Sequence, residues 1–102
     1  MFMSKKQKIE SDTVVAQIKE LVSSNLDGET VLMSVENGKY YGMDGIGSRI
    51  WELVASPRSI SDVCNILIEE FEVDREKCER DVLDFLEDLR KQKLIKVINE
   101  KT

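Results

Sequence analysis

Apolar residues recur at helical spacing through the second half of the chain. A stripe at i, i+3, i+4, i+7, i+8 and i+11 starts at Ile60 and predicts an amphipathic helix, with "SISD" at 59–62 as its capping box. A second stripe predicts a longer helix over 75–91, which Asp74 can cap. A shorter helix is predicted between Asp44, its candidate cap, and Pro57. Its apolar stripe consists of Ile46, Ile50, Leu53 and Val54.

Short runs of β-forming residues fill the first half. "TVLMSVE" at 30–36 precedes Asn37-Gly38, a pair that favours a two-residue hairpin turn. This turn would place Val35 opposite Tyr40 in the next strand. "LIKVI" at 94–98 predicts a last short strand, whereas residues 13–22 fit either a helix or a strand.

Both faces of the predicted hairpin are largely apolar. A hairpin with one face in water alternates more cleanly, so we expect either the chain itself or a partner to cover the second face. The pattern leaves open which face is buried. One face carries Leu32, Tyr41 and Met43, and the other carries Val31, Met33, Val35 and Tyr40.

The order of elements defines the expected fold class. The 102 residues suffice for one domain. A hairpin, three helices and a terminal strand predict an α+β, winged-helix-like domain, with a three-stranded antiparallel sheet packed on three helices. Residues 1–11 lack the apolar segment of a secretory signal, and no apolar run is long enough for a membrane span. We expect a disordered tail over 1–11, a folded domain over 12–99 and a cytoplasmic protein.

Residue types set limits on the chemistry. The chain has no histidine, which excludes Ser-His-Asp and Cys-His catalysis and removes the commonest zinc ligand. Cys64 and Cys78 fall at apolar helix positions and are interpreted as free buried thiols. We therefore expect no enzymatic activity, no metal site and no cofactor.

Charge is unevenly spread along the chain. The net charge is −5, yet residues 69–88 hold ten acidic and three basic residues. Such a segment is either a solvated helix face or a field that attracts a basic peptide. The third predicted helix lies largely in it, and phosphate neutralisation needs the opposite charge. This argues against DNA as a partner.

Several short motifs together resemble the PqqD family, the small peptide-recognition domains of ribosomal-peptide biosynthesis that are also called RiPP recognition elements. The similarity covers about residues 27–95, and Met43 and Asp44 stand where the family usually has Leu-Asn. Within the family the chain is most similar to the stand-alone leader-binding proteins of lasso-peptide biosynthesis. The motifs are Gly-Lys-Tyr-Tyr-x-x-Asp at 38–44, Ile50-Trp51, Val73-Asp74, and Asp81 ahead of Phe85-Leu86.

The resemblance implies a binding mode. Residues 13–19 would form the first strand, which leaves 39–43 as a sheet edge that pairs with the leader of a precursor peptide. The leader would also lie in a groove against the third helix. The alternative is ordinary packing, across the sheet for the tyrosines and in the core for Val82 and Phe85. The candidate peptide-binding residues are Lys39, Tyr40, Tyr41, Gly42 and Met43 on the strand and Cys78, Asp81, Val82 and Phe85 on the helix.

The resulting hypothesis is a non-catalytic adaptor. It would bind the leader and deliver the peptide to a separate processing enzyme, a leader peptidase of a lasso-peptide pathway, without nucleic acid or membrane partners. Alternatives are a winged-helix DNA-binding regulator, a PqqD-type chaperone of a radical-SAM peptide-modifying system, and a structural oligomerisation domain.

Overall fold

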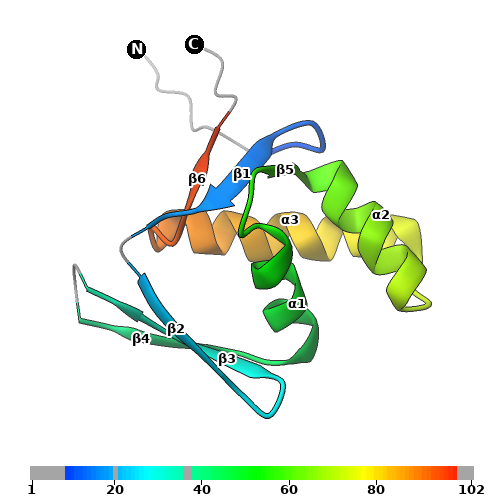
Figure 1. The fold of residues 1–102 in the computed structure, drawn as a ribbon. Coiled ribbons are helices and arrows are strands. Elements are labelled where there is room, and N and C mark those ends of the chain that lie inside the picture. Colours follow the sequence, from blue (N-terminus) through cyan, green and yellow to red (C-terminus); the bar gives the residue numbers. More distant parts are fainter. Residues whose placement is uncertain (1–8, 20, 36–37, 99–102) are drawn as a thin grey trace, which may run out of the picture.

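The computed structural model describes residues 9–19, 21–35 and 38–98. The described part contains three helices and six strands (Figure 1). In chain order they are β1 (Val14–Gln17), β2 (Leu21–Leu26), β3 (Glu29–Ser34), β4 (Tyr40–Met43), α1 (Gly45–Leu53), β5 (Arg58–Ser59), α2 (Ile60–Glu70), α3 (Arg75–Lys91) and β6 (Ile95–Val97).

The strands form two separate antiparallel sheets. One has the order β2-β3-β4 and the other has the order β5-β1-β6. In Figure 1 the β2-β3-β4 sheet lies at one end of the molecule, and α1 lies between it and the remaining elements. The α+β class, the three helices and a three-stranded antiparallel sheet are confirmed. The second sheet was not predicted, because its strands have only two to four residues.

The first strand of the β2-β3-β4 sheet differs from the expectation. The prediction that residues 13–19 fill this place is wrong, because β1 pairs with β5 and β6 instead. β2 takes the place, joined to β3 by a two-residue turn in which Asp27 has φ 53° and Gly28 has φ 82°. Both central residues of a type I′ turn have positive φ, which explains the Asp-Gly pair.

The pairing of β3 with β4 is shifted by two residues from the predicted register. Met33, rather than Val35, lies opposite Tyr40. Ser34 N–H donates to the Lys39 carbonyl at 2.9 Å, so the connection is longer than a two-residue turn. Asn37 and the Glu36 partner predicted for Lys39 lie outside the described residues. A shift by two keeps every side chain on its predicted face.

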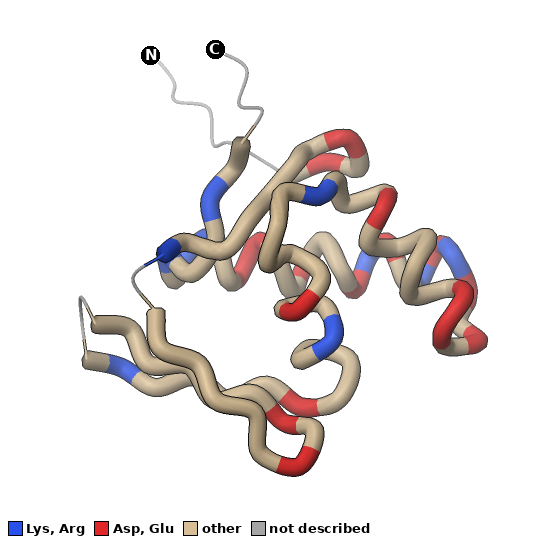
Figure 2. The backbone as a smooth tube through the Cα atoms, viewed as in Figure 1, with Lys and Arg blue, Asp and Glu red and all other residues tan. Residues whose placement is uncertain are grey.

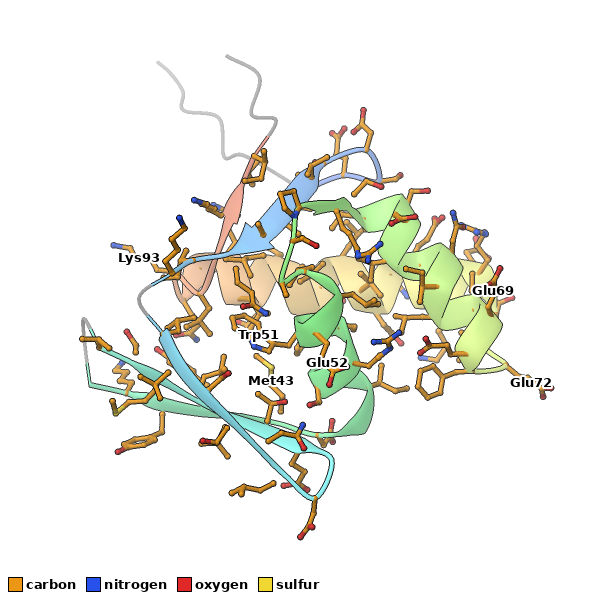
Figure 3. The ribbon with its side chains drawn as sticks, viewed as in Figure 1. Met43, Trp51, Glu52, Glu69, Glu72 and Lys93 are labelled. Atoms are coloured by element: carbon orange, nitrogen blue, oxygen red, sulfur yellow. The ribbon has the colours of Figure 1, made fainter. Side chains whose placement is uncertain are left out.

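The structure shows which face of the hairpin is buried. Leu32 is 0% exposed and Met43 is 6% exposed, and Tyr41 packs against the same core half-buried. Met43 points from β4 toward Trp51 of α1 (Figure 3). The opposite face is open, with Tyr40 71% exposed.

The three helices follow their predicted caps, and their predicted apolar stripes are buried or half-buried apart from Ile46, which is 46% exposed. Ser59 Oγ accepts a hydrogen bond from Asp62 N–H, and Asp74 Oδ2 accepts one from Lys77 N–H, both at 3.0 Å. Asp44 occupies the N-cap of α1, although its side chain makes no capping hydrogen bond. Both cysteines are free and buried, as predicted.

The N-terminal segment lies only partly within the described residues. Residues 1–8 of the expected tail fall outside them, whereas Ile9 is 7% exposed and belongs to the core. Among the helices of residues 9–98 that the structure describes, none is long and apolar enough to cross a membrane.

Candidate functional site

β4 is an edge strand in the described part of the chain, as predicted. It pairs with β3 on one side only, in the order β2-β3-β4. The bond between Ser34 and Lys39 fixes the alternation of the ladder, so Leu32 and Tyr41 form the next hydrogen-bonded pair. The main-chain groups of Tyr40 and Gly42 therefore point away from β3, toward the open edge.

The exposed face of the sheet is open at Gly42. A β-carbon placed there would meet no atom within 4 Å. Tyr40 and Gly42 face the exposed side of the sheet, and Tyr41 and Met43 face the core. An extended peptide could add to β4 with its own side chains alternating between these two sides.

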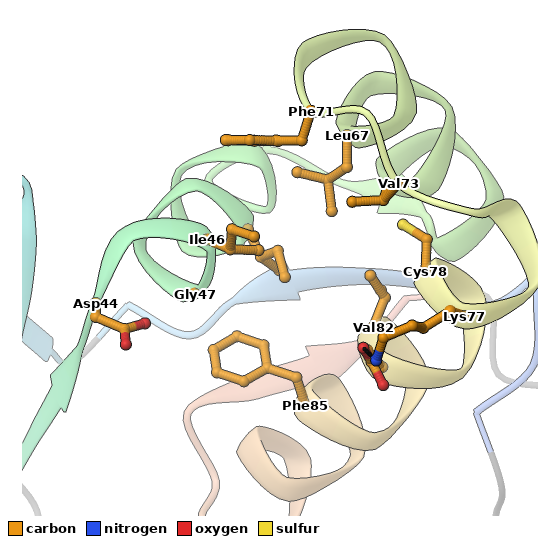
Figure 4. Close-up of a pocket in the computed structure, with 12 residues that line it drawn as sticks. Asp44, Ile46, Gly47, Leu67, Phe71, Val73, Lys77, Cys78, Val82 and Phe85 are labelled. Atoms are coloured by element: carbon orange, nitrogen blue, oxygen red, sulfur yellow. Dashed lines mark hydrogen bonds and ion pairs between the residues drawn. The ribbon is translucent and has the colours of Figure 1, made fainter.

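A pocket of about 270 Å³ lies beyond the C-terminal end of β4 (Figure 4). α3 provides one wall and brings together the four helix residues singled out from the sequence, with Lys77 beside them. Their common position follows from the 3.6-residue period of a helix that is 17 residues long. These four residues are Cys78, Asp81, Val82 and Phe85.

The opposite wall comes from segments that the sequence reasoning did not assign to the site. Ile46, Gly47 and Ile50 of α1 line it, together with Leu67 of α2 and Phe71 and Val73 of the following turn. One feature of the sequence could have indicated this wall: an apolar residue stands in the first turn of α1, where a polar residue is usual. Ile46 lies in the first turn of α1 and is 46% exposed, although its spacing placed it in the buried stripe.

The nine predicted residues fall into two adjoining groups. No residue of β4 lines the pocket, which begins at Asp44, the residue after the strand. A β-carbon on Gly47 would lie 3.7 Å from Met43 Cβ, so the end of β4 touches the pocket wall. The structure thus joins an open sheet edge to an apolar pocket.

The pocket rim is charged. Lys77 Nζ contacts Asp81 Oδ2 at 2.9 Å, and both side chains are more than half exposed. Acidic residues gather around the turn between α2 and α3, with Glu69 and Glu72 directed outward (Figures 2 and 3). A basic segment of a peptide would be attracted to this end of the molecule.

An ion pair braces the helices that frame the pocket. Arg49 of α1 donates Nε–H to Glu70 Oε1 at 2.8 Å and an Nη–H to Oε2 at 2.6 Å. The hydrogen bonds that Glu70 accepts from Arg49 lower the pKa of Glu70, and the accepting carboxylates of Glu70 and Glu52 raise the pKa of Arg49. The bidentate geometry holds α1 against the end of α2.

A buried thiol lies next to Cys78 of the pocket wall. Burial, with the neighbouring Cys78, raises the pKa of the Cys64 thiol to about 12, so it is a poor nucleophile at neutral pH. Residues 9–19, 21–35 and 38–98 contain no cluster of three or more potential metal ligands. An apolar pocket beside an open edge is suited to holding an extended peptide.

Comparison with solved structures finds three similar chains. TbiB1, solved in complex with the TbiA(beta) leader peptide, is 32% identical with a TM-score of 0.74, over 85% of this chain and 99% of that one. A lasso peptide synthetase B1 complexed with a leader peptide is 23% identical with a TM-score of 0.72, over 80% and 96%. The PqqD truncation of Methylobacterium extorquens PqqCD, described as a RiPP recognition element, is 18% identical with a TM-score of 0.72, over 86% and 94%.

Comparison of the sequence with protein families agrees with the structural similarity to these three chains. Comparison with curated proteins gives no match. The family described as coenzyme PQQ synthesis protein D matches residues 29–95, which span β3 to the start of β6 and include both the edge strand and α3. The chain belongs to the PqqD family.

Proposed function

We propose that this protein is a non-catalytic adaptor for a ribosomally made precursor peptide. It binds the leader segment of the precursor by strand addition to β4 and holds it in the adjoining groove against α3. It then delivers the peptide to a separate processing enzyme, a leader peptidase of a lasso-peptide pathway.

The observation that carries this proposal is the open edge of β4 beside the pocket. Main-chain groups of Tyr40 and Gly42 offer hydrogen bonds to any extended peptide, whatever its sequence. The pocket, which includes Val82 and Phe85, can then select among side chains. TbiB1, the 32% identical relative, was solved with a leader peptide, and that supports a leader as the ligand.

The lasso-peptide assignment is supported by the fold that this chain shares with a lasso peptide synthetase B1, which was solved with a leader peptide. Delivery to a second protein is supported by the chemistry of the site. The pocket lining has no histidine and no nucleophile paired with a base, so cleavage of the leader requires another protein.

Charge favours a peptide over nucleic acid as the ligand. The pocket rim and the turn between α2 and α3 are acidic, and α3 would have to approach phosphates if the fold read DNA. A leader with lysine or arginine near its pocket-bound part would complement this charge.

The test first searches the genes around this one for a short precursor peptide, and then titrates its leader segment into ¹⁵N-labelled protein. Strand addition should shift the amide signals of Tyr40 and Gly42 more than that of Tyr41, whose N–H faces β3. Uniform shifts, or none, would refute binding at this edge. Delivery is tested with a leader peptidase from the same group of genes as the precursor, which should cleave the precursor faster when this protein is present.

A further inference from the structure

Gly47 occupies a position where alanine would be the better helix former. It is buried in the first turn of α1, and its φ lies outside the left-handed region. Glycine in a helix interior costs about 1 kcal/mol relative to alanine. The backbone does not require glycine here, so the reason for it must lie in the surroundings of the residue.

The ring of Phe85 fills the space beside Gly47. A β-carbon on Gly47 would lie 3.2 Å from Phe85 Cζ and 3.4 Å from Cε1, closer than ordinary contact. The ring tip is the far end of a side chain, so a shift of a few tenths of an ångström would relieve this contact. Folding alone therefore gives little reason to avoid alanine.

The Gly47–Phe85 contact lies where the sheet edge meets the pocket. Both residues line the pocket, and Met43, the last residue of β4, lies beside Gly47. Figure 4 shows the Phe85 ring directed from α3 toward Gly47, with Asp44 next to them. A peptide strand on β4 that continues past Met43 reaches the pocket across this contact.

The geometry points to Gly47 and Phe85 as the residues that set the size of the one apolar side chain that the leader inserts into the pocket. The inference deepens the proposed function and rests on it, because the occupant belongs to the peptide that adds to β4. The pocket, about 270 Å³, is smaller than the ~300–1,000 Å³ of most small-molecule sites, which suits a single side chain. Its mainly apolar lining calls for an apolar one.

The test separates side-chain size from strand addition. N-acetyl amides of leucine, phenylalanine and tryptophan are titrated into methyl-labelled protein, and the shifts of the Ile46 and Ile50 methyl groups give each dissociation constant. In Gly47→Ala, the tryptophan amide should lose affinity relative to the leucine amide by at least about fivefold, which is about 1 kcal/mol. The added methyl group takes space in the pocket wall whether or not the ring moves.

Two variants serve as controls. Gly45→Ala changes another glycine of the same helix, where a β-carbon meets no atom within 4 Å, and should leave the affinity ratio unchanged. Phe85→Leu in the Gly47→Ala background should bring the ratio of affinities for the tryptophan and leucine amides back toward the wild-type value, because the two residues are in contact and their effects are not additive. Should Gly47→Ala not fold, Phe85→Leu alone should raise the relative affinity for the tryptophan amide.

Two results would overturn the inference. One is that folded Gly47→Ala has the wild-type ratio of affinities for the tryptophan and leucine amides. The other is that none of the three amides shifts the methyl signals. The amides bind without strand addition. If the protein selects among the amides by size as expected but binds no leader, the proposed function is refuted, whereas the role of Gly47 and Phe85 in setting the pocket size is not.

Discussion

Tyr41 lies opposite Leu32 as a hydrogen-bonded pair of the β3–β4 ladder, and this places the main-chain groups of Gly42 at the open edge of the sheet. The two neighbouring residues therefore have different roles. A proline in place of Tyr41 would break the hairpin, whereas a proline in place of Gly42 removes an N–H that points away from β3 and leaves the β3–β4 hydrogen bonds intact.

We expect Gly42→Pro to fold and to lose at least about tenfold in leader affinity. One main-chain hydrogen bond is worth about 0.5–1.5 kcal/mol, and the proline ring also blocks the approach of the added strand. Fluorescence anisotropy of a labelled leader gives the affinity, and circular dichroism confirms the fold. Gly42→Ala retains the N–H and meets no neighbouring atom, so it should bind as the wild type does. Wild-type affinity in folded Gly42→Pro would place the leader elsewhere.

A buried hydrogen bond ties the β2-β3-β4 sheet to α1. The hydroxyl groups of Thr30 in β3 and Ser48 in α1 bond to each other, and the residues are 4% and 3% exposed. Ser48→Ala should lower the free energy of unfolding by about 1–3 kcal/mol, because it leaves the Thr30 hydroxyl buried without its partner. Urea denaturation measures this loss.

The matched control replaces both hydroxyl groups. Thr30→Val with Ser48→Ala should recover part of the stability lost in Ser48→Ala, since no polar group then remains unsatisfied. The two hydroxyls would act independently if the losses in free energy of unfolding of Ser48→Ala and Thr30→Val simply add in the double variant.

The sequence predicted well which residues of α3 share one face of the helix. An apolar stripe repeated through 17 residues fixes a helix face, so Cys78, Val82 and Phe85 had to lie together whatever the tertiary structure. The edge position of β4 was also predicted, although the strand that makes it an edge was misidentified.

The sequence did not predict the strand β2 or the pocket wall at Ile46, and both misses have a physical cause. Five of the six residues of β2 are exposed, so its sequence, "LVSSNL", carries no alternation to mark a strand. Periodicity likewise cannot show that Ile46 lines a pocket, because this depends on how far α1 lies from α3. Local signals define elements, whereas exposure within a stripe follows from packing.

The Cys64 thiol makes stability depend on alkaline pH. Its folded pKa of about 12 lies above the ordinary value of 9.0, owing to burial and the neighbouring Cys78. The thiol therefore loses its proton at lower pH in the unfolded chain than in the folded one. The stabilisation that the buried neutral thiol gives the folded state is fully present below about pH 9, and it is lost as pH rises toward about 12. We expect the free energy of unfolding to fall between about pH 8 and about pH 10 more steeply in the wild type than in Cys64→Ala. Equal slopes in urea denaturation would contradict this.

Asp81 and Asp84 are both exposed acidic residues of α3, and they border different hollows of the surface. Asp81 lines the pocket next to β4, whereas Asp84 borders another hollow with Leu83 and Glu87. The two positions form a pair matched in charge, because the same substitution changes the net charge equally, although Asp81→Lys also removes the ion-pair partner of Lys77.

Asp81→Lys should slow leader association and weaken binding by up to about fivefold, or about 1 kcal/mol. The effect is limited because Asp81 is exposed and already paired with Lys77 at 2.9 Å. Asp84→Lys should have a smaller effect, since Asp84 does not line the pocket, and salt screens the exposed charges at both positions. Stopped-flow association rates at increasing salt measure both, and the difference between the variants should shrink as salt rises. Equal effects at low salt would mean that the leader senses only the diffuse negative field of the segment 69–88, and Asp81 would lose its specific role.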